Sequence, residues 1–133
     1  EIDTIFLVAP TTSEDRVKSI VELTSGYVYY VSLKGVTGAS ISDTQSVQRN
    51  VDALRKMTDL PVVVGFGVKD EQSAKNMSGV SDGVIVGTAL VKNIESLNHS
   101  TKVNYQDIAR CTHIIKNIRN QLDSEFNVTR KES

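Results

Sequence analysis

Residues 61–67 (PVVVGFG) join a run of three valines to two closely spaced glycines. Consecutive β-branched residues are typical of a strand that is buried on both faces of a parallel sheet. Glycines that directly follow such a strand leave backbone N–H groups uncovered by side chains at its carboxyl end. This stretch therefore predicts a strand of a parallel sheet that ends in a bare main-chain turn.

The same arrangement recurs along the chain. An apolar run over 26–32 leads into the loop 35–38 (GVTG), and a run over 83–86 leads into Gly87 and Thr88. An earlier run over 4–9 ends at a proline. We expect strands at about 4–9, 26–32, 61–65 and 83–87.

Helical periodicity follows each predicted strand. Ser13 or Thr12 is expected to cap the first helix, and the third helix is expected from about Asp70 through Met77. The apolar stripes of the first, second and last helices comprise Val17, Ile20 and Val21; Val47, Val51 and Leu54; and Ile108, Cys111, Ile115, Ile118 and Leu122. Alternation of strands and helices at this spacing predicts an α/β fold of βαβ units. Four units in 133 residues make one compact half of a (β/α)8 barrel, for which ~250 residues are typical.

The composition excludes several classes of partner. With 39% hydrophobic residues, 23% charged residues and a net charge of −1, the chain has no basic face for nucleic acid or anionic lipid. No apolar run approaches the ~20 residues of a membrane span. The single cysteine rules out an internal disulfide, so a cytoplasmic location is expected. Because the chain begins at Glu1 without methionine and a strand follows closely, we expect it to be a segment of a larger protein.

The glycines at the strand ends predict a phosphate site. Bare amides, one set of them at a helix start, bind an anion without a lysine. Gly65, Gly67, Gly87 and Thr88 would supply such amides, with the Thr88 hydroxyl beside them, because phosphate sites follow the last two strands of many barrels. The alternative is that the glycines only permit tight turns. The loop 33–43 is either a surface loop or a lid that completes the anion site on closure.

Groups for acid–base catalysis are missing from the predicted strand ends. No carboxylate, histidine or lysine stands there, and Asp3 and Asp82 precede their strands at the opposite rim. Tyr29 either packs in the core or directs its hydroxyl into the barrel mouth. No pair of His or Cys has metal-ligand spacing, so no metal is expected, and Cys111 is expected to be a small core residue. This half is predicted to bind rather than to transfer protons.

Five segments occur along the chain in this order: 6–10 (FLVAP), 26–32 (GYVYYVS), 35–39 (GVTGA), 65–68 (GFGV) and 86–92 (VGTALVK). Together they resemble the tryptophan synthase α subunit over almost the whole chain. The tyrosine strand with its GVTG loop is the specific part. The resemblance implies the last four βα units, the C-terminal half, of a (β/α)8 barrel. It implies retro-aldol cleavage of indole-3-glycerol phosphate to indole and glyceraldehyde 3-phosphate, a carbon–carbon lyase step of tryptophan biosynthesis. It also implies a partner β subunit, which carries pyridoxal phosphate, and no cofactor in this chain.

The resemblance also assigns roles to individual positions. Tyr29 matches the active-site tyrosine of the family. Thr37 and Gly38 match its closing loop, and the phosphate cradle is matched by Gly65, Phe66, Gly67, Gly87 and Thr88. At position 88 threonine replaces a common serine and keeps the hydroxyl, whereas 9–11 (APT) departs from the frequent Pro-Pro-Asn and weakens any expectation about β-subunit contacts there. The catalytic carboxylates of the family belong to earlier strands, so this segment alone is expected to be inactive.

Two alternatives stay open at this point. One is another phosphate-binding barrel, such as indole-glycerol-phosphate synthase, which a basic residue at a strand end would favour. Lys34 and Lys69 lie in predicted loops and do not meet that condition. The other is a non-catalytic half-barrel that associates with itself or with the missing N-terminal half through its exposed sheet edges.

Overall fold

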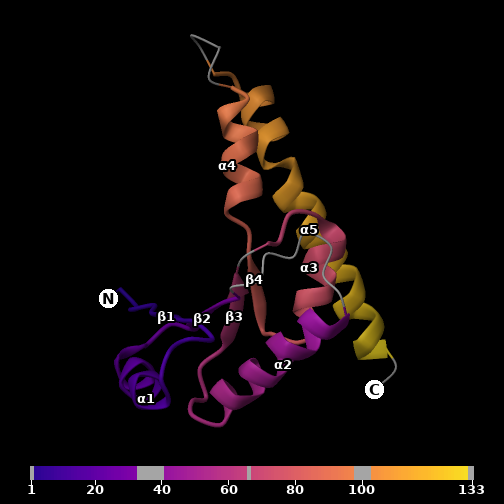
Figure 1. Cartoon of the computed structure of the whole chain (residues 1–133). Helices are drawn as coiled ribbons and strands as arrows, with labels where there is room; N and C mark the ends of the chain where they lie inside the picture. Colours follow the sequence, from indigo (N-terminus) through magenta and orange to yellow (C-terminus); the bar gives the residue numbers. More distant parts are fainter. Residues whose placement is uncertain (1, 33–40, 66, 98–102, 132–133) are drawn as a thin grey trace.

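The architecture is a parallel sheet with helices that follow its strands, seen in a computed structural model that describes residues 2–32, 41–65, 67–97 and 103–131 (Figure 1). Strands and helices alternate along the chain until the last two helices, which are consecutive. The elements are β1 (Leu7–Val8), α1 (Glu14–Leu23), β2 (Val28–Val31), α2 (Ile41–Arg55), β3 (Val62–Gly65), α3 (Glu71–Ser78), β4 (Gly83–Ile85), α4 (Thr88–Glu95) and α5 (Tyr105–Lys131). The strands lie within the ranges expected from the sequence, and each is shorter.

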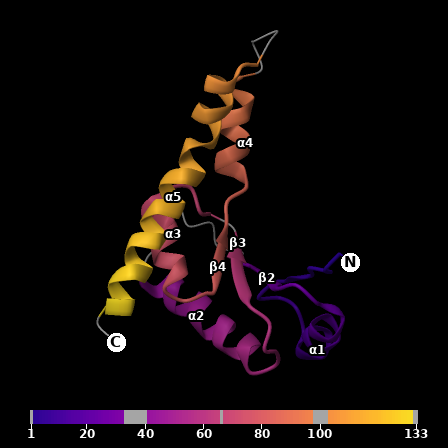
Figure 2. The same cartoon turned by 180° about the vertical axis from the view of Figure 1, so that it is seen from behind.

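Each strand pairs in parallel with the next one along the chain, in the order β1-β2-β3-β4. In this register Tyr29 lies beside Leu7 on one side and beside Val63 on the other. The four carboxyl ends therefore meet at one edge of the sheet. Figures 1 and 2 show that α4 continues from β4 beyond this edge and runs alongside α5.

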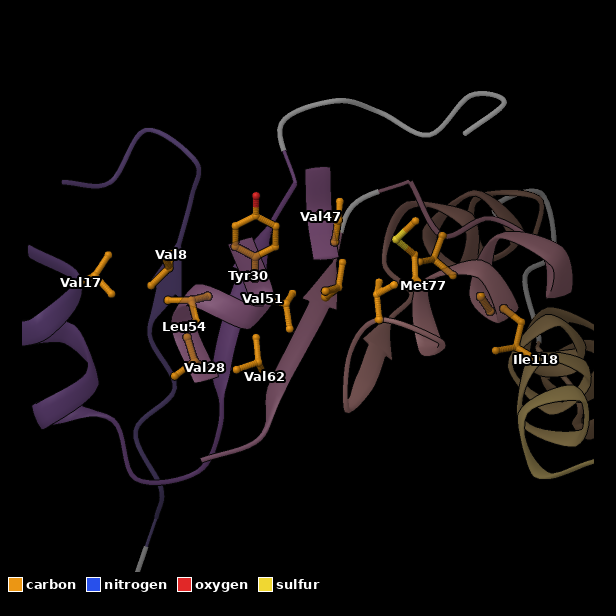
Figure 3. Packing of buried hydrophobic residues seen from close by; sticks show 14 residues of the cluster. Val8, Val17, Val28, Tyr30, Val47, Val51, Leu54, Val62, Met77 and Ile118 are labelled. Atoms are coloured by element: carbon orange, nitrogen blue, oxygen red, sulfur yellow. The ribbon is translucent and has the colours of Figure 1, made fainter. Parts of the chain in front are cut away.

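Helices cover one face of the sheet. Val28, Tyr30, Val62 and Val64 alternate along β2 and β3 and are buried. Figure 3 shows how they pack with apolar side chains of α1, α2, α3 and α5, among them Val17, Val47, Val51, Leu54, Met77 and Ile118. The Asn50 amide donates to the Tyr30 hydroxyl at 2.8 Å. Burial raises the pKa of Tyr30, and this hydrogen bond opposes the rise only in part.

The opposite face carries the side chains of the other parity: Leu7, Tyr29, Val31, Val63 and Ile85. None of these is fully buried, and Leu7 is 57% exposed. Side chains alternate between the two faces of a strand, and the face without helices is the inner one in a (β/α)8 barrel. Tyr29 therefore lies on the face that such a barrel turns inward.

Asp82 ties the strands together at their amino ends, on the rim expected from the sequence. Its carboxylate accepts hydrogen bonds from the Val62 amide at 2.8 Å and from the Arg55 guanidinium at 2.9 Å. Burial raises the pKa of Asp82, but these two hydrogen bonds and the Arg55 charge outweigh it and hold the pKa below its usual value. Asp82 thus acts as an ionised brace between α2, β3 and β4.

The predicted stripe of α5 is only partly buried. Cys111 and Ile118 are core residues, as expected, and Leu122 packs against the core. Ile108 and Ile115 are instead 51% and 36% exposed. At 100° per residue these two isoleucines lie at one edge of the stripe, and that edge extends past the surface on which α5 packs.

Candidate functional site

The candidate site is the edge where the strands end, and the structure brings most of its predicted residues there. Tyr29, Gly65, Gly67, Gly87 and Thr88 lie in the described part of the chain, on β2 or at the ends of the paired strands β3 and β4. The remaining predicted positions, Thr37, Gly38 and Phe66, lie outside the described residues.

Tyr29 and Gly65 form one close contact. A Cβ atom built on Gly65 would lie 2.2 Å from the Tyr29 hydroxyl and 2.2 Å from Cε2 of its ring. Tyr29 is the diagonal neighbour of Gly65 on the same face, since it pairs with Val63 two residues earlier. The absence of a side chain at Gly65 therefore lets the Tyr29 ring lie across β3 and brings its hydroxyl to the end of that strand.

The backbone conformation at position 67 favours glycine. Its φ of 79° lies in the left-handed region, which side chains disfavour and glycine adopts freely. The chain uses this turn to leave β3 and to start α3 a few residues later. Gly67 thus fits the alternative of a tight turn, whereas Gly65 is explained by the space that the Tyr29 ring occupies.

The start of α3 is closed by its own side chains. The Asp70 carboxylate accepts from the Ser73 amide at 2.8 Å, and the Ser73 hydroxyl receives the Lys69 and Asp70 amides at 3.0 and 3.1 Å. Asp70 and Ser73 form a capping box. These hydrogen bonds from Ser73 lower the pKa of Asp70, so the carboxylate stays ionised and is unsuited to donate a proton. Residues 70–73 carry this pattern (DEQS), which was available in the sequence.

The start of α4 is open. Its N-cap is Gly87, no side chain caps it, and its first turn holds no acidic residue. A Cβ atom on Gly87 would meet nothing within 4 Å. Thr88 begins the helix, and its side chain is exposed. The positive end of this helix is therefore left uncompensated.

Several backbone N–H groups at the ends of β3 and β4 have no acceptor among the described residues. Among the residues that the structure describes, no acceptor is bonded to the amides of Gly67, Gly87, Thr88 or Ala89. Amides at a helix N-terminus have no partner within the helix, and an anion can occupy that position. The arrangement can bind a phosphate-like group through main-chain donors and the Thr88 hydroxyl.

The described strand ends supply no group for proton transfer. Pro10, Ser32, Gly65 and Gly87 follow or end the strands, and none of the four carries a carboxylate, an imidazole or an amine. Among residues 2–32, 41–65, 67–97 and 103–131, no cluster of three or more His, Cys, Asp or Glu could hold a metal ion. The site combines an uncapped helix start with a tyrosine on an apolar face of the sheet.

The helices of the described ranges do not combine the length and the apolar character of a membrane span. Each of them is too short or too polar to cross a bilayer.

Comparison with known proteins gives a consistent result. A family model described as "Tryptophan synthase alpha chain" matches residues 1–122. The tryptophan synthase alpha chain of Neisseria gonorrhoeae is 53% identical over 96 residues, which are 72% of this chain and 37% of that protein. That of Nitrosococcus oceani is 42% identical over 127 residues, 96% of this chain and 46% of that protein.

Solved structures agree on the fold. The tryptophan synthase subunit alpha of Legionella pneumophila superposes with a TM-score of 0.74 at 28% identity, over 92% of this chain and 43% of that one. The subunit from Campylobacter jejuni gives 0.70 at 35% identity, over 88% and 44%. The chain spans 36% to 46% of the length of the curated relatives it matches. The expected fold, part of a (β/α)8 barrel, is thereby confirmed.

Proposed function

This chain belongs to the tryptophan synthase alpha chain family, and on that premise we propose that the protein cleaves indole-3-glycerol phosphate into indole and glyceraldehyde 3-phosphate. The reaction is a retro-aldol cleavage in tryptophan biosynthesis, so the protein is a carbon–carbon lyase. Within it, this chain holds the substrate by its phosphate. The observation that carries the proposal is the uncapped, acid-free N-terminus of α4 beside the bare strand end at Gly67.

The phosphate would bind at the β4–α4 junction. The amides of Gly87, Thr88 and Ala89 lack acceptors among the described residues, and the Thr88 hydroxyl is exposed next to them. A dianionic phosphate receives hydrogen bonds there and also neutralises the positive end of α4. Phe66 would complete the cradle, and Thr37 and Gly38 would close over it, as the family resemblance implies.

The rest of the substrate would lie on the inward face of the sheet. Tyr29, Val31, Val63 and Ile85 present a continuous surface there, and the Tyr29 hydroxyl is the polar group among them. We assign the indole ring to this surface and the glycerol hydroxyls to the side of Tyr29. This geometry leaves the phosphate at the strand ends and the scissile carbon–carbon bond over the sheet.

The cleavage itself needs two proton transfers. A base removes a glycerol hydroxyl proton as the carbonyl forms, and an acid protonates the indole ring carbon that loses its bond. The described strand ends offer neither group, and the Asp70 carboxylate, which follows β3, is engaged by the Ser73 amide as the N-cap of α3. We therefore assign both transfers to residues outside this chain, and we expect the chain alone to be inactive and to need no cofactor.

The expected partners follow from the same proposal. The family relationship supports assembly with a tryptophan synthase β subunit, which would use the indole and carry pyridoxal phosphate. The free edges of β1 and β4, together with the exposed Leu7, favour pairing with further parallel strands. We propose the missing strands of the barrel as that partner and the cytoplasm as the location.

Titration calorimetry with glycerol 3-phosphate tests the phosphate assignment. We expect the chain to bind it and Thr88→Asp to weaken binding about tenfold or more, because the carboxylate repels the phosphate and neutralises the helix N-terminus. Ser19→Asp is the control, since it adds the same charge on α1, which lies far from α4 in both views (Figures 1 and 2). Equal affinities of the parent, Thr88→Asp and Ser19→Asp proteins would show that the anion does not bind at α4.

A further inference from the structure

Helix α4 has little apolar packing to fix its direction. None of its eight residues is buried, and Val91 and Ile94 are each 53% exposed. Its first residue follows β4 through Val86 and Gly87, and a Cβ atom on Gly87 would contact nothing within 4 Å. Figures 1 and 2 show α4 beside α5 and away from the core of Figure 3.

A reciprocal pair of hydrogen bonds joins α4 to α5. The Asn93 side-chain amide donates to the Cys111 carbonyl at 3.2 Å, and the Cys111 thiol donates to the Asn93 carbonyl at 3.0 Å. In the described part of the chain these are the hydrogen bonds that link the two helices. Both residues serve as donor and as acceptor, so the pair fixes rotation as well as distance.

The α5 side of this pair is firmly anchored. Cys111 is 4% exposed, and Ile118, two turns further along the same stripe, is also 4% exposed in the core. Lys75 of α3 binds Glu125 at 2.7 Å and holds α5 further down. The contact with Cys111 therefore joins α4 to a helix that is itself fixed to the core cluster through Ile118.

The position of Asn93 lets this pair of hydrogen bonds affect the orientation of the proposed anion site. Asn93 lies five residues after Thr88, roughly 7.5 Å along the helix at 1.5 Å per residue. Because α4 is held at this point and at the end of β4, the pair sets the tilt of the helix axis. That tilt determines where the free amides of Gly87, Thr88 and Ala89 point.

We propose that Asn93, through its reciprocal hydrogen bonds with Cys111, is a positioning residue that aims the N-terminus of α4 at the phosphate. The inference rests on the proposed phosphate site and adds to it a residue that does not contact the ligand. Apolar side chains at the same positions would hold the two helices together but would let α4 slide and rotate along α5.

Calorimetry with glycerol 3-phosphate on matched variants tests this role. Asn93→Leu keeps the size of the side chain and removes the donor, and we expect it to weaken binding about three- to tenfold. Asn76→Leu is the control, because Asn76 on α3 is also half-buried and loses a hydrogen bond with Gln72. It should bind as the parent does, and an equal loss in both variants would overturn the proposal.

A second pair of variants separates positioning from packing. Cys111→Ser retains a donor toward the Asn93 carbonyl, so we expect its affinity to stay within twofold of the parent. Cys111→Ala is nearly the same size and has no donor, so its affinity should fall as in Asn93→Leu. Identical affinities for the serine and alanine variants would contradict the role of the hydrogen bond.

Amide resonances distinguish this inference from the proposed function. In ¹H–¹⁵N spectra without ligand, Asn93→Leu should shift the Thr88 and Ala89 signals and Asn76→Leu should not. If the parent protein binds no glycerol 3-phosphate but Asn93→Leu still shifts these signals, the phosphate site is refuted and the role of Asn93 in orienting α4 is upheld. If Asn93→Leu leaves the Thr88 and Ala89 signals unchanged and the parent protein binds glycerol 3-phosphate, only the role of Asn93 is refuted.

Discussion

The β3–α3 and β4–α4 junctions resemble each other in sequence but differ in how they satisfy their own backbone. At the first, Gly65 makes room for Tyr29, Gly67 adopts a positive φ, and Asp70 with Ser73 caps the helix. At the second, Gly87 touches nothing that would exclude a side chain, and α4 has neither a cap nor an acid. The first junction is explained by the protein itself, whereas the second leaves its amides without an acceptor among the described residues, which is where we propose that the phosphate binds.

The comparison teaches how to interpret a glycine at a strand end. A glycine that the fold requires carries no information about a ligand. A glycine with open space above it and unbonded amides around it indicates a binding site. Substitution of each glycine by alanine therefore tests the difference between the two junctions.

Gly65→Ala should have the largest effect. The new methyl group would overlap the Tyr29 ring, and overpacking of this kind costs about 1–3 kcal/mol. We expect urea unfolding to show that loss, and Tyr29→Ala in the same chain to recover about 1 kcal/mol or more of it. Gly83→Ala is the control on the same face, since its Cβ would meet Val63 only at 3.5 Å. Strictly additive losses would show that the two residues do not compete for space.

Gly67→Ala should have an intermediate effect. Holding alanine at φ 79° costs about 1 kcal/mol or slightly more. Equilibrium unfolding in urea would measure it against Gly79→Ala, a site with φ −67° and only ordinary contacts. Equal stability of the two variants would mean that the turn after β3 tolerates a side chain.

Gly87→Ala should have the smallest effect on folding. Its Cβ meets no atom within 4 Å, so we expect the free energy of unfolding to change by no more than about 0.5 kcal/mol. The same variant should bind glycerol 3-phosphate several-fold more weakly, because the methyl group enters the space assigned to the anion. A folding loss as large as that of Gly67→Ala would erase the contrast between the two junctions.

The sequence predicted the parts of this protein that depend on local patterns. The valine run of β3, the alternation of strands and helices, and the buried Cys111 all follow from spacing and side-chain type. The exposure of Ile108 and Ile115 was missed, because periodicity defines a stripe but not how much of it a neighbour covers. The calls on Thr37, Gly38 and Phe66 lie outside the described residues and stay predictions.

The relations between distant residues could not be predicted in this way. Nothing around Gly65 indicates that Tyr29, 36 positions earlier, occupies the space above it. Asn93 and Cys111 are 18 positions apart and belong to no recognisable motif. The sequence indicates in part which helix starts are capped. Residues 70–73 carry a capping-box pattern, and residues 87–91 (GTALV) do not.

Tyr29 and Tyr30 are adjacent in the chain but belong to opposite faces of β2. Tyr30 is buried and hydrogen-bonded to Asn50 of α2, whereas Tyr29 lies on the opposite face, to which we assign the substrate. Among the signals of the four tyrosines after fluorine labelling, those of Tyr30 and Tyr29 would therefore be two reporters on one strand. The first would report on the integrity of the core and the second on occupancy of the proposed site.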